Sequence, residues 1–217
     1  MKMGFLNYLT GWRKLGIKRG DLVLEVGSGG NPLIRSDVLC DKYILDDFER
    51  ALGNVSIPII MDRPFVCGDA EFLPFRDNSF DFLVSFHMME HLENPDLFLE
   101  EAQRVAPQGY IVTPNSNCES LFGSYKHRWL IDVSEDNEIL LKNKSDVGGI
   151  LNGFFHQLYK TNADFRTFWH HNSHLFEARF RWQRPIIYSL ENDLAAQPAQ
   201  QGWFTKATLK SESTASE

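Results

Sequence analysis

The chain has 217 residues, a formal net charge of −7, 43% hydrophobic residues and 13% aromatic residues. This length is sufficient for one domain with a sizeable core. The acidic balance argues against a general nucleic-acid-binding surface, and no apolar run approaches the roughly 20 residues that a membrane span requires.

The three cysteines, Cys40, Cys67 and Cys118, are scattered and odd in number. This pattern favours reduced thiols over a disulfide framework, so we expect a cytoplasmic protein. The N-terminal segment, residues 1–20, is short and amphipathic and lacks the features of a signal peptide. We expect no membrane partner and no nucleic-acid partner, and either a monomer or a homodimer.

The first half of the chain alternates short apolar runs with short connections. A helix is predicted from Asn94, its cap, through Pro95, its first residue, to about residue 106. Alternating strands and crossovers predict an α/β fold with a Rossmann-like, mostly parallel sheet and helices on both faces. The strands are predicted at residues 22–26, 37–41, 64–69, 80–86 and 109–114.

The second half departs from this pattern. Residues 115–175 are rich in His, Asn, Phe and Trp, and we expect loops and helices that cover the substrate at the carboxyl edge of the sheet. Residues 175–183 and 185–190 are expected to form a C-terminal antiparallel hairpin, which brings the sheet to seven strands. Residues 1–192 are expected to form a single domain, and the polar residues 193–217 a flexible tail.

A glycine-rich loop follows the first predicted strand. The apolar run ends at Glu25, and Gly27, Ser28, Gly29 and Gly30 come directly after it. A loop with so few side chains lets a ligand rest against the backbone. Because such loops serve several cofactors, the remaining strand ends must identify the ligand.

The carboxyl ends of parallel strands meet at one edge of the sheet, where open α/β sheets bind ligands. A carboxylate after the second strand can accept hydrogen bonds from both ribose hydroxyls, and Asp69 can accept one from an adenine amino group. The set therefore suits an adenosine ligand. Besides the glycine loop, it comprises Asp41, Asp69-Ala70, Phe86-His87 and Thr113 to Asn115.

The same residues resemble the class I S-adenosylmethionine-dependent methyltransferases, of the type 11-like branch that acts on small molecules. Four segments between residues 20 and 116 match the family's motifs in order and spacing. They are Glu-Val-Gly-Ser-Gly-Gly at 25–30, Gly-Asp-Ala-Glu at 68–71 with Leu73 to Asp81, His-Met-Met-Glu-His-Leu at 87–92, and Arg104-Val105 with Gly109 and Thr113 to Asn115.

The resemblance implies S-adenosylmethionine as cofactor and assigns roles to the matching residues. Glu25 would orient the loop, and Gly27, Ser28 and Gly29 would hold the methionine part. Asp69 and Ala70 would hold adenine, and Phe86 would offer backbone to the cofactor's amino group.

The ribose carboxylate has two candidates. Asp41 is preferred, but if residues 43–45 form the second strand, Asp46 takes the role. The loop also departs from the family, because Asn31 and Pro32 stand where a third glycine is common. Asparagine tolerates positive φ, so we expect the loop to keep its shape.

Methyl transfer by direct displacement requires a nucleophile in line with the S–CH₃ bond. An oxygen or nitrogen nucleophile must also lose a proton, and histidine suits that role near neutral pH. His91 and His87 are the candidate bases, and Glu90 is a possible partner of His91. Candidate substrate contacts are Asn115, His127, Arg128 and Trp129; alternatively, the last three supply a salt bridge and a core indole.

We expect no metal ion, although His170 and His174 are spaced i, i+4 as a chelating pair can be. The expected acceptor is a small metabolite, a peptide or a sugar. Two alternatives remain open. A non-catalytic subunit that binds S-adenosylmethionine is one, and an NAD-dependent oxidoreductase is the other, but its motif requires glycine where Pro32 stands.

Overall fold

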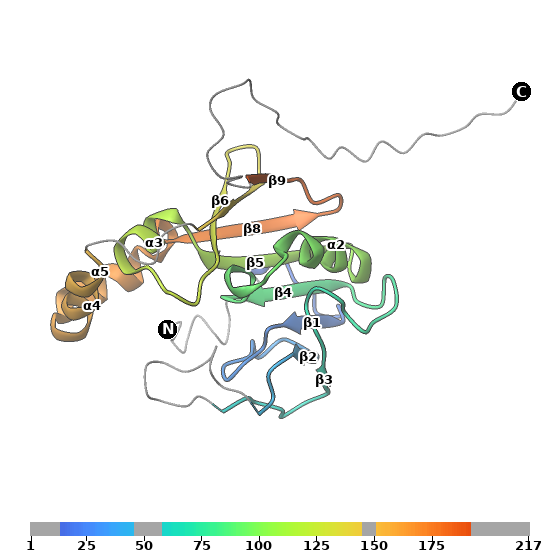
Figure 1. Cartoon of the computed structure of the whole chain (residues 1–217). Helices are drawn as coiled ribbons and strands as arrows, with labels where there is room; N and C mark the ends of the chain where they lie inside the picture. The colour runs from blue at the N-terminus through green and yellow to red at the C-terminus, as the bar shows by residue number, and fades with distance from the viewer. Residues whose placement is uncertain (1–13, 46–57, 145–150, 192–217) are drawn as a thin grey trace, which may run out of the picture.

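The computed structural model describes residues 14–45, 58–144 and 151–191, and its main sheet is mostly parallel, as predicted (Figure 1). Neighbouring strands pair in parallel, except that β8 is antiparallel to β5. The Rossmann-like α/β prediction is therefore confirmed. The order is β3 (Phe65–Cys67), β2 (Val38–Asp41), β1 (Val23–Val26), β4 (Phe82–Phe86), β5 (Gln108–Pro114) and β8 (Glu177–Gln183).

The predicted C-terminal hairpin is wrong. β8 and β9 (Tyr188–Glu191) lie in different sheets, so the described main sheet has six strands. β9 instead pairs in parallel with β7 (Ile139–Asn143), which pairs antiparallel with β6 (Trp129–Val133). The physical reason is that the β6–β7 hairpin offers β9 an open edge, while β8 buries its alternate side chains against the main core.

The region 115–175 contains this hairpin as well as the expected helices and loops. Trp129, Ile131, Ile139 and Leu141 alternate with less buried residues and join the main core. This alternation is a strand signal that the expectation of loops and helices overlooked. The helices of the region are α3 (Ser116–Phe122), α4 (Asn152–Thr161) and α5 (Ala163–His171).

The main sheet carries a different cover on each face. Helix α2 (Pro95–Val105) buries Phe98, Leu99 and Ala102 on one face, where its start and end agree with the prediction. On the opposite face, within the described ranges, Ile17 and Leu33 pack against β1 and β4. None of the helices described is long and apolar enough to cross a membrane.

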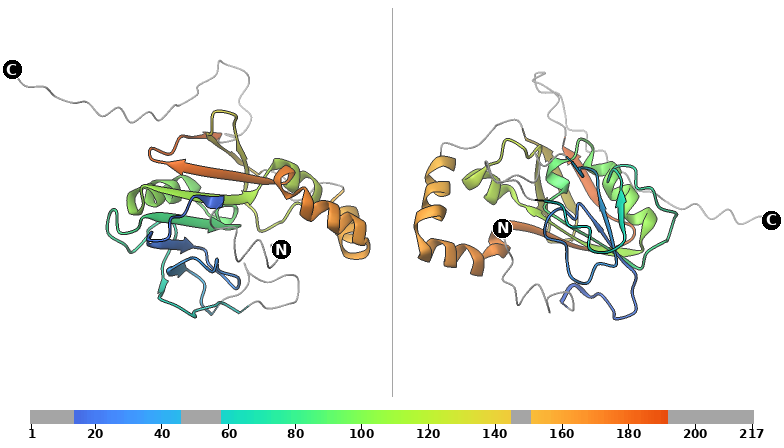
Figure 2. Two further views of the ribbon diagram at one scale, coloured as in Figure 1. Left: turned by 180° about the vertical axis from the view of Figure 1, so that it is seen from behind. Right: turned by 90° about the horizontal axis from the view of Figure 1, so that it is seen from below.

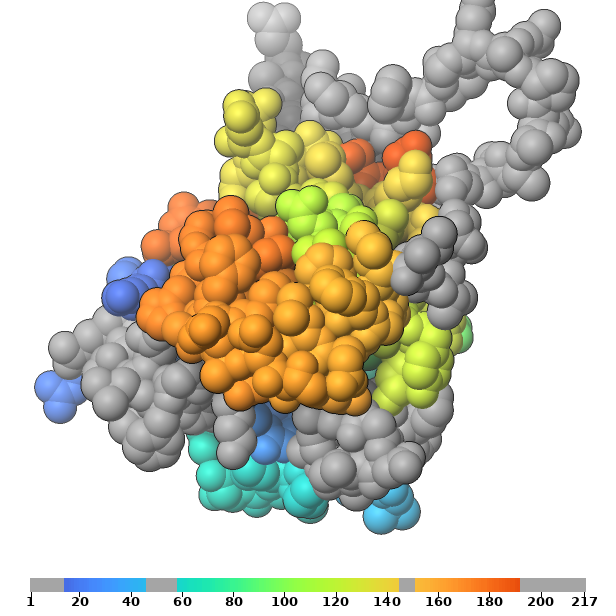
Figure 3. All heavy atoms as spheres, turned by 90° about the vertical axis from the view of Figure 1, so that its left-hand side faces the viewer, coloured from blue at the N-terminus to red at the C-terminus, as the bar shows by residue number. Residues whose placement is uncertain are grey.

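Helices α4 and α5 project beyond the carboxyl ends of the parallel strands (Figure 2). Figure 3, which views the molecule from that side, shows them in front of this edge. Aromatic contacts hold them in place: Phe122 of α3 lies 4.5 Å from Trp169 of α5, and Trp169 stacks on Phe176 at 3.9 Å, measured between ring centroids. The predicted tail, residues 193–217, and most of the predicted amphipathic segment 1–20 lie outside the described residues.

The loop after β3 is anchored to α2. The Glu71 carboxylate accepts hydrogen bonds from the backbone N–H of Asn94 at 2.8 Å and from its side-chain amide at 3.2 Å, which ties the loop to the start of the helix. Further along the helix, the Arg104 guanidinium donates to the carbonyls of Phe75 at 2.8 Å and Leu73 at 3.0 Å. These contacts hold the segment that carries Asp69 and Ala70.

The glycine-rich loop after β1 is organised by Glu25, whose side chain is only 2% exposed. Its Oε2 atom accepts two hydrogen bonds, from the Leu33 backbone N–H at 2.8 Å and from the Ser36 hydroxyl at 2.6 Å. The carboxyl group therefore ties the end of β1 to the far side of the loop. Burial raises its pKa to about 7, although these two hydrogen bonds and Arg63 act in the opposite direction.

We predict that replacing Glu25 with Gln changes how stability depends on pH. The unfolded carboxyl ionises near pH 4.5, whereas the folded one keeps its proton until about pH 7, so its contribution to stability is complete below pH 4.5 and is lost as pH rises through 7. Glutamine cannot ionise, and its single oxygen can accept both bonds. As pH rises from 4.5 to 8, the free energy of unfolding of Glu25→Gln should increase by about 3 kcal/mol relative to that of the wild type.

Urea unfolding of both proteins across this pH range measures the difference. The matched control is Glu135→Gln, which removes a carboxylate from an exposed turn. If the Glu25→Gln and wild-type stability curves stay parallel from pH 4.5 to 8, the proposed burial cost is wrong.

Candidate functional site

The sheet order brings most of the predicted cofactor residues to one edge. Strands β3, β2, β1 and β4 are consecutive neighbours, so their carboxyl ends form a continuous row. The strand order reverses between β1 and β4, which is where ligands bind in open α/β sheets. The row contains Gly27, Ser28 and Gly29 after β1, Asp41 at the end of β2, Asp69 and Ala70 after β3, and Phe86 at the end of β4.

Two glycines give the loop its shape. Gly27 and Gly29 have φ angles of +72° and +52°, in the left-handed region that favours glycine. The Gly27 N–H donates to the Cys40 carbonyl at 2.8 Å, so the loop folds back toward β2. A Cβ atom on Gly27 would lie 2.3 Å from Cγ of Met88, so there is no room for a side chain here.

The second strand ends at Asp41, the preferred of the two ribose candidates. Residues 38–41 form the strand and residues 43–45 do not, and Asp46 lies outside the described residues. Asp41 Oδ2 accepts from the Gly29 N–H at 2.9 Å and Oδ1 from the Tyr43 N–H at 3.0 Å. The carboxylate thus braces the glycine loop from the neighbouring strand; its contact with a ribose stays a prediction.

Asp69 lies at the turn after β3, beside the end of β2. Lys42 Nζ lies 2.7 Å from its Oδ2 atom, and the Glu71 N–H donates to Oδ1 at 3.0 Å. Burial raises the pKa of Asp69, but the hydrogen bond from Lys42 and that from Glu71 outweigh it, so the pKa lies below its usual range. Asp69 is therefore an ionised acceptor, and the adjacent Ala70 is buried.

The loop also holds a buried polar atom that suits a ligand. The Ser28 hydroxyl is buried and has no hydrogen-bond partner within residues 14–45, 58–144 and 151–191. Buried polar groups nearly always have a partner. An orphan hydroxyl, a glycine turn without side chains and the carboxylates of Asp41 and Asp69 along one edge fit a polar cofactor such as S-adenosylmethionine.

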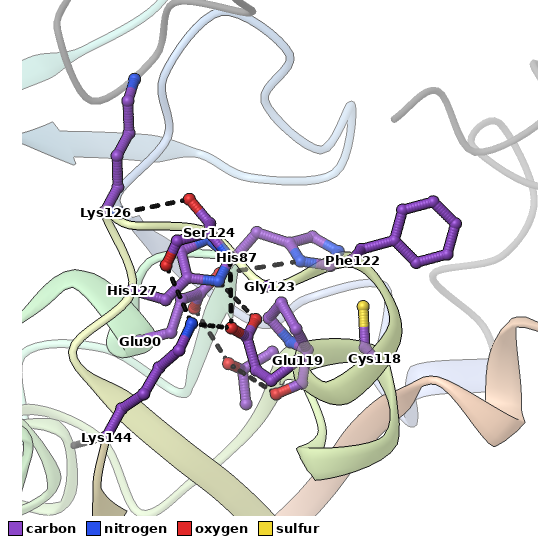
Figure 4. A network of polar contacts seen from close by, with 12 residues as sticks. His87, Glu90, Cys118, Glu119, Phe122, Gly123, Ser124, Lys126, His127 and Lys144 are labelled. Carbon is purple, nitrogen blue, oxygen red and sulfur yellow. Dashed lines mark hydrogen bonds and ion pairs between the residues drawn. The ribbon is translucent and has the colours of Figure 1, made fainter. Parts of the chain in front are cut away.

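A second group of polar side chains follows β4 (Figure 4). His87 comes directly after the strand with a φ angle of +52°, and the 3₁₀ turn η2 (Met89–His91) follows. Glu90 Oε1 lies 3.8 Å from His87 Nδ1 and 3.9 Å from His91 Nε2, so the carboxyl group stands between the two imidazoles. The structure therefore brings both candidate bases to one carboxylate.

Burial disfavours the charged form of all three groups, and it lowers the pKa of His87 to about 4. Glu90 is 1% exposed and its Oε2 accepts from the Thr113 hydroxyl at 2.9 Å. Burial raises the pKa of Glu90 to about 7. Burial, together with the nearby charges of His127 and Lys126, lowers the pKa of His91 to about 3, so this imidazole is neutral at physiological pH. The His87 side chain is 38% exposed, and its Nε2 lies 4.0 Å from Glu177 Oε1.

The predicted substrate residues do not converge on one point. His127 turns inward, and its Nδ1 atom lies 2.5 Å from Oε1 of the buried Glu119. Arg128 turns outward, 3.2 Å from Glu93 Oε1, with its side chain 55% exposed. Trp129 is buried in the core, and its indole N–H donates to the Leu92 carbonyl at 2.9 Å. Arg128 and Trp129 thus have the alternative roles that the sequence allowed, a salt bridge and a core indole. Contact of these residues with a substrate stays a prediction.

Asn115 connects three segments. Its Oδ1 accepts from the Cys118 N–H at 3.0 Å and so caps α3, while its Nδ2 donates to the Leu175 carbonyl at 3.0 Å. The side chain therefore positions the helix and the segment before β8.

His170 and His174 lie away from the strand ends, on α5 and in the 3₁₀ turn η3 (Ser173–Leu175), and His170 Nε2 lies 3.2 Å from the Tyr159 hydroxyl.

Two residues that sequence reasoning missed complete this network. Glu119 is 4% exposed, and Lys144 Nζ lies 2.5 Å from its Oε2 atom. The pKa of Glu119 is lowered because the hydrogen bonds and charges of His127 and Lys144 outweigh the effect of burial. Glu119, His127 and Lys144 come from α3, the following loop and the end of β7. No local spacing could link them, since the β6–β7 hairpin brings them together.

Comparisons with known proteins agree with this geometry. Residues 24–113 match the family model described as a methyltransferase domain. A demethylmenaquinone methyltransferase of Renibacterium salmoninarum is 30% identical over 122 residues, which cover 53% of this chain and 51% of that protein. An ajmaline N-methyltransferase of Rauvolfia serpentina is 42% identical over 45 residues, which cover 21% of this chain and 16% of that one. The chain thus matches about half or less of each relative's length.

Two of the similar solved structures are a SAM-dependent methyltransferase from Aquifex aeolicus, with 22% identity and a TM-score of 0.35, and the YcgJ protein from Bacillus subtilis, with 19% identity and a TM-score of 0.39. The first covers 50% of this chain and 63% of the other, and the second covers 51% of each. The family model spans β1 to β5 and therefore all the strand ends described above, so residues 24–113 are similar to a methyltransferase domain.

Proposed function

We propose that the protein transfers a methyl group from S-adenosylmethionine to an oxygen or nitrogen atom of a small metabolite, a peptide or a sugar. The observation that carries this proposal is the row of polar groups at the carboxyl ends of β3, β2, β1 and β4, inside the region that matches the family. When bound, S-adenosylmethionine supplies a methyl group on a sulfonium sulfur, which a nucleophile can displace directly. The residues of the chain must then bind the cofactor and the acceptor, align the nucleophile with the S–CH₃ bond, and accept the proton of the nucleophile.

Different residues would contact different parts of S-adenosylmethionine. Gly27, Ser28 and Gly29 would hold the methionine part, with Glu25 and Asp41 keeping the loop in shape from either side. Asp41, the last residue of β2, would accept the ribose hydroxyls. Asp69, whose lowered pKa keeps it ionised, would accept from the adenine amino group beside Ala70. The backbone of Phe86 would meet the cofactor's amino group.

Of the two candidate bases, we favour His87. It follows Phe86 directly, so it lies nearest to the point where the cofactor and an acceptor would meet. Its ring is partly exposed and stands between two carboxyl groups, 3.8 Å from Glu90 and 4.0 Å from Glu177. These would stabilise the imidazolium that forms when His87 takes a proton from the nucleophile. His91 instead packs edge-to-face on His127, with ring centroids 4.8 Å apart.

The acceptor would lie between this edge and the helices that project over it. We propose that residues 115–175 cover the substrate as part of a single domain that spans residues 1–192. Helices α4 and α5 stand in front of the carboxyl edge in Figure 3. On α4, Phe155 and Tyr159 pack against Phe122, whereas the more exposed Phe154 is available to a ligand. His127 and Arg128 line a pocket together with Trp129, and Asn115 caps α3 directly after β5.

We predict that S-adenosylhomocysteine binds and NADH does not. This product of methyl transfer should raise the melting temperature of the full chain, because a ligand that binds only the folded state stabilises it. Differential scanning calorimetry with each ligand at the same concentration measures the effect. Stabilisation by NADH alone would establish the oxidoreductase alternative instead.

We predict that Gly27→Ala weakens binding of S-adenosylhomocysteine at least about tenfold, because the new Cβ would collide with Met88 and the residue would keep a positive φ. The matched control is Gly20→Ala, since no atom lies within 4 Å of a Cβ built there. Titration calorimetry gives both dissociation constants. Equal affinities in the two variants would move the cofactor away from this loop. Asp69→Asn should weaken binding of S-adenosylhomocysteine while the glycine-rich loop keeps its shape.

We predict that His87→Gln retains cofactor affinity but loses turnover by roughly 100-fold or more, as expected for removal of a general base. Turnover is measured as S-adenosylhomocysteine released from S-adenosylmethionine in the presence of a panel of alcohols, amines, sugars, peptides and quinols. The matched control is His174→Gln, an exposed histidine in η3. An unchanged rate in His87→Gln would exclude His87 as the base. If no acceptor supports turnover although the cofactor binds, the non-catalytic alternative gains support.

A further inference from the structure

We propose that Glu90, His91 and His127 form a binding site for a divalent transition-metal ion such as Zn²⁺. Each residue offers one ligand atom, and these atoms lie within 4.8 Å of one another. Two imidazoles and one carboxylate form a mixed nitrogen and oxygen set, which suits zinc and its neighbours. Magnesium and calcium prefer oxygen ligands alone. The proposed site is separate from the row of cofactor residues and does not depend on which acceptor is methylated.

The first observation is an unsatisfied carboxylate oxygen. Glu90 is 1% exposed, and its Oε1 atom has no hydrogen-bond partner in the described part of the chain. The other oxygen, Oε2, accepts from Thr113, which holds the carboxyl group in place. Leaving a buried oxygen without a partner is costly. This atom lies 3.9 Å from His91 Nε2 and 3.8 Å from His87 Nδ1, so it is within reach of an ion held by His91.

The second observation is the orientation of the two imidazoles. The His91 and His127 rings meet edge-to-face, with centroids 4.8 Å apart. His127 Nδ1 lies 2.5 Å from Glu119 Oε1, which leaves its Nε2 atom for a metal ion. Histidine ligands commonly donate their other ring N–H to a carboxylate, which fixes the tautomer and raises the basicity of the ligating nitrogen. Glu119 is placed to do this for His127.

The distances are compatible with zinc after a small adjustment. Zinc lies about 2.0–2.2 Å from nitrogen and oxygen ligands, so tetrahedral ligand atoms are roughly 3.4 Å apart. From separations of up to 4.8 Å, side-chain rotations must close the triangle by about 0.5–1.5 Å. Three protein ligands leave a fourth position for water or another ligand.

The neighbouring charges are of both signs: Lys126 is close enough to lower the pKa of His91, whereas the second lysine nearby is neutralised. Lys144 Nζ is paired with Glu119 at 2.5 Å, and the two form a buried pair of opposite charge next to His127. Glu90 then contributes a negative charge to the ion itself. A bound ion would join the turn after β4, which carries Glu90 and His91, to the loop before β6, which carries His127. These two segments lie beside the region in which we propose that the acceptor binds.

The test is a Zn²⁺ titration of the full chain after treatment with a chelator, followed by calorimetry. We expect one equivalent to bind, and Co²⁺ to give the intense visible absorption of a tetrahedral site. Glu90→Gln and His127→Gln should weaken Zn²⁺ binding by more than tenfold, and Glu119→Gln by roughly 10–100-fold. His174→Gln is the matched control, because this exposed histidine lies in η3, away from the proposed ligands; it should bind zinc as the wild type does.

Circular dichroism verifies that each variant is folded. The proposal is overturned if the wild type binds no stoichiometric zinc, if cobalt gives the weak spectrum of an octahedral site, or if folded His127→Gln binds zinc as tightly as the wild type. Should the ligand variants fail to fold, the wild-type stoichiometry and the cobalt spectrum decide the question. Binding of S-adenosylhomocysteine measured on the same samples tests the proposed function separately.

Discussion

The parallel pairing of β1 with both β2 and β4 is the constraint on which the rest of this structure depends. Because β1 is hydrogen-bonded on both sides, its carboxyl end opens into the point where the strand order reverses. The glycine-rich loop turns at this carboxyl end of β1. Glu25 holds it from within the strand, and Asp41 holds it from the neighbouring strand. One strand thus determines where a ligand can lie and which backbone groups face it.

A buried polar network lies next to this edge and has a different origin. His87, Glu90 and His91 follow β4, whereas Glu119, His127 and Lys144 come from the region between β5 and β9. Burying this many ionisable groups is costly unless they are paired. Most are paired, as the contacts of Glu119 with His127 and Lys144 show. The remaining oxygen of Glu90 is therefore the feature of this network that most needs a ligand.

The elements that the sequence predicted well are those whose signals are local. The strands that became β1, β2, β4 and β5, the loop at 27–30 and the start of α2 at Pro95 follow from apolar runs, glycines and a proline at a helix start. The second half was predicted less well. The alternation at 129–133 and 139–143 was overlooked, and β9 was paired with β8 because they are adjacent in sequence. Strand pairing between distant segments has no local signature.

The sequence by itself determined the fold class and the position of the glycine-rich loop after the first strand, because these depend on residue type and on spacing within single elements. Only the tertiary structure decided that Asp41 ends the second strand, that Trp129 belongs to the core, and that Glu90, His91 and His127 share one buried space. The physical reason is that burial and the contact of side chains far apart in the chain arise only when separate elements pack together.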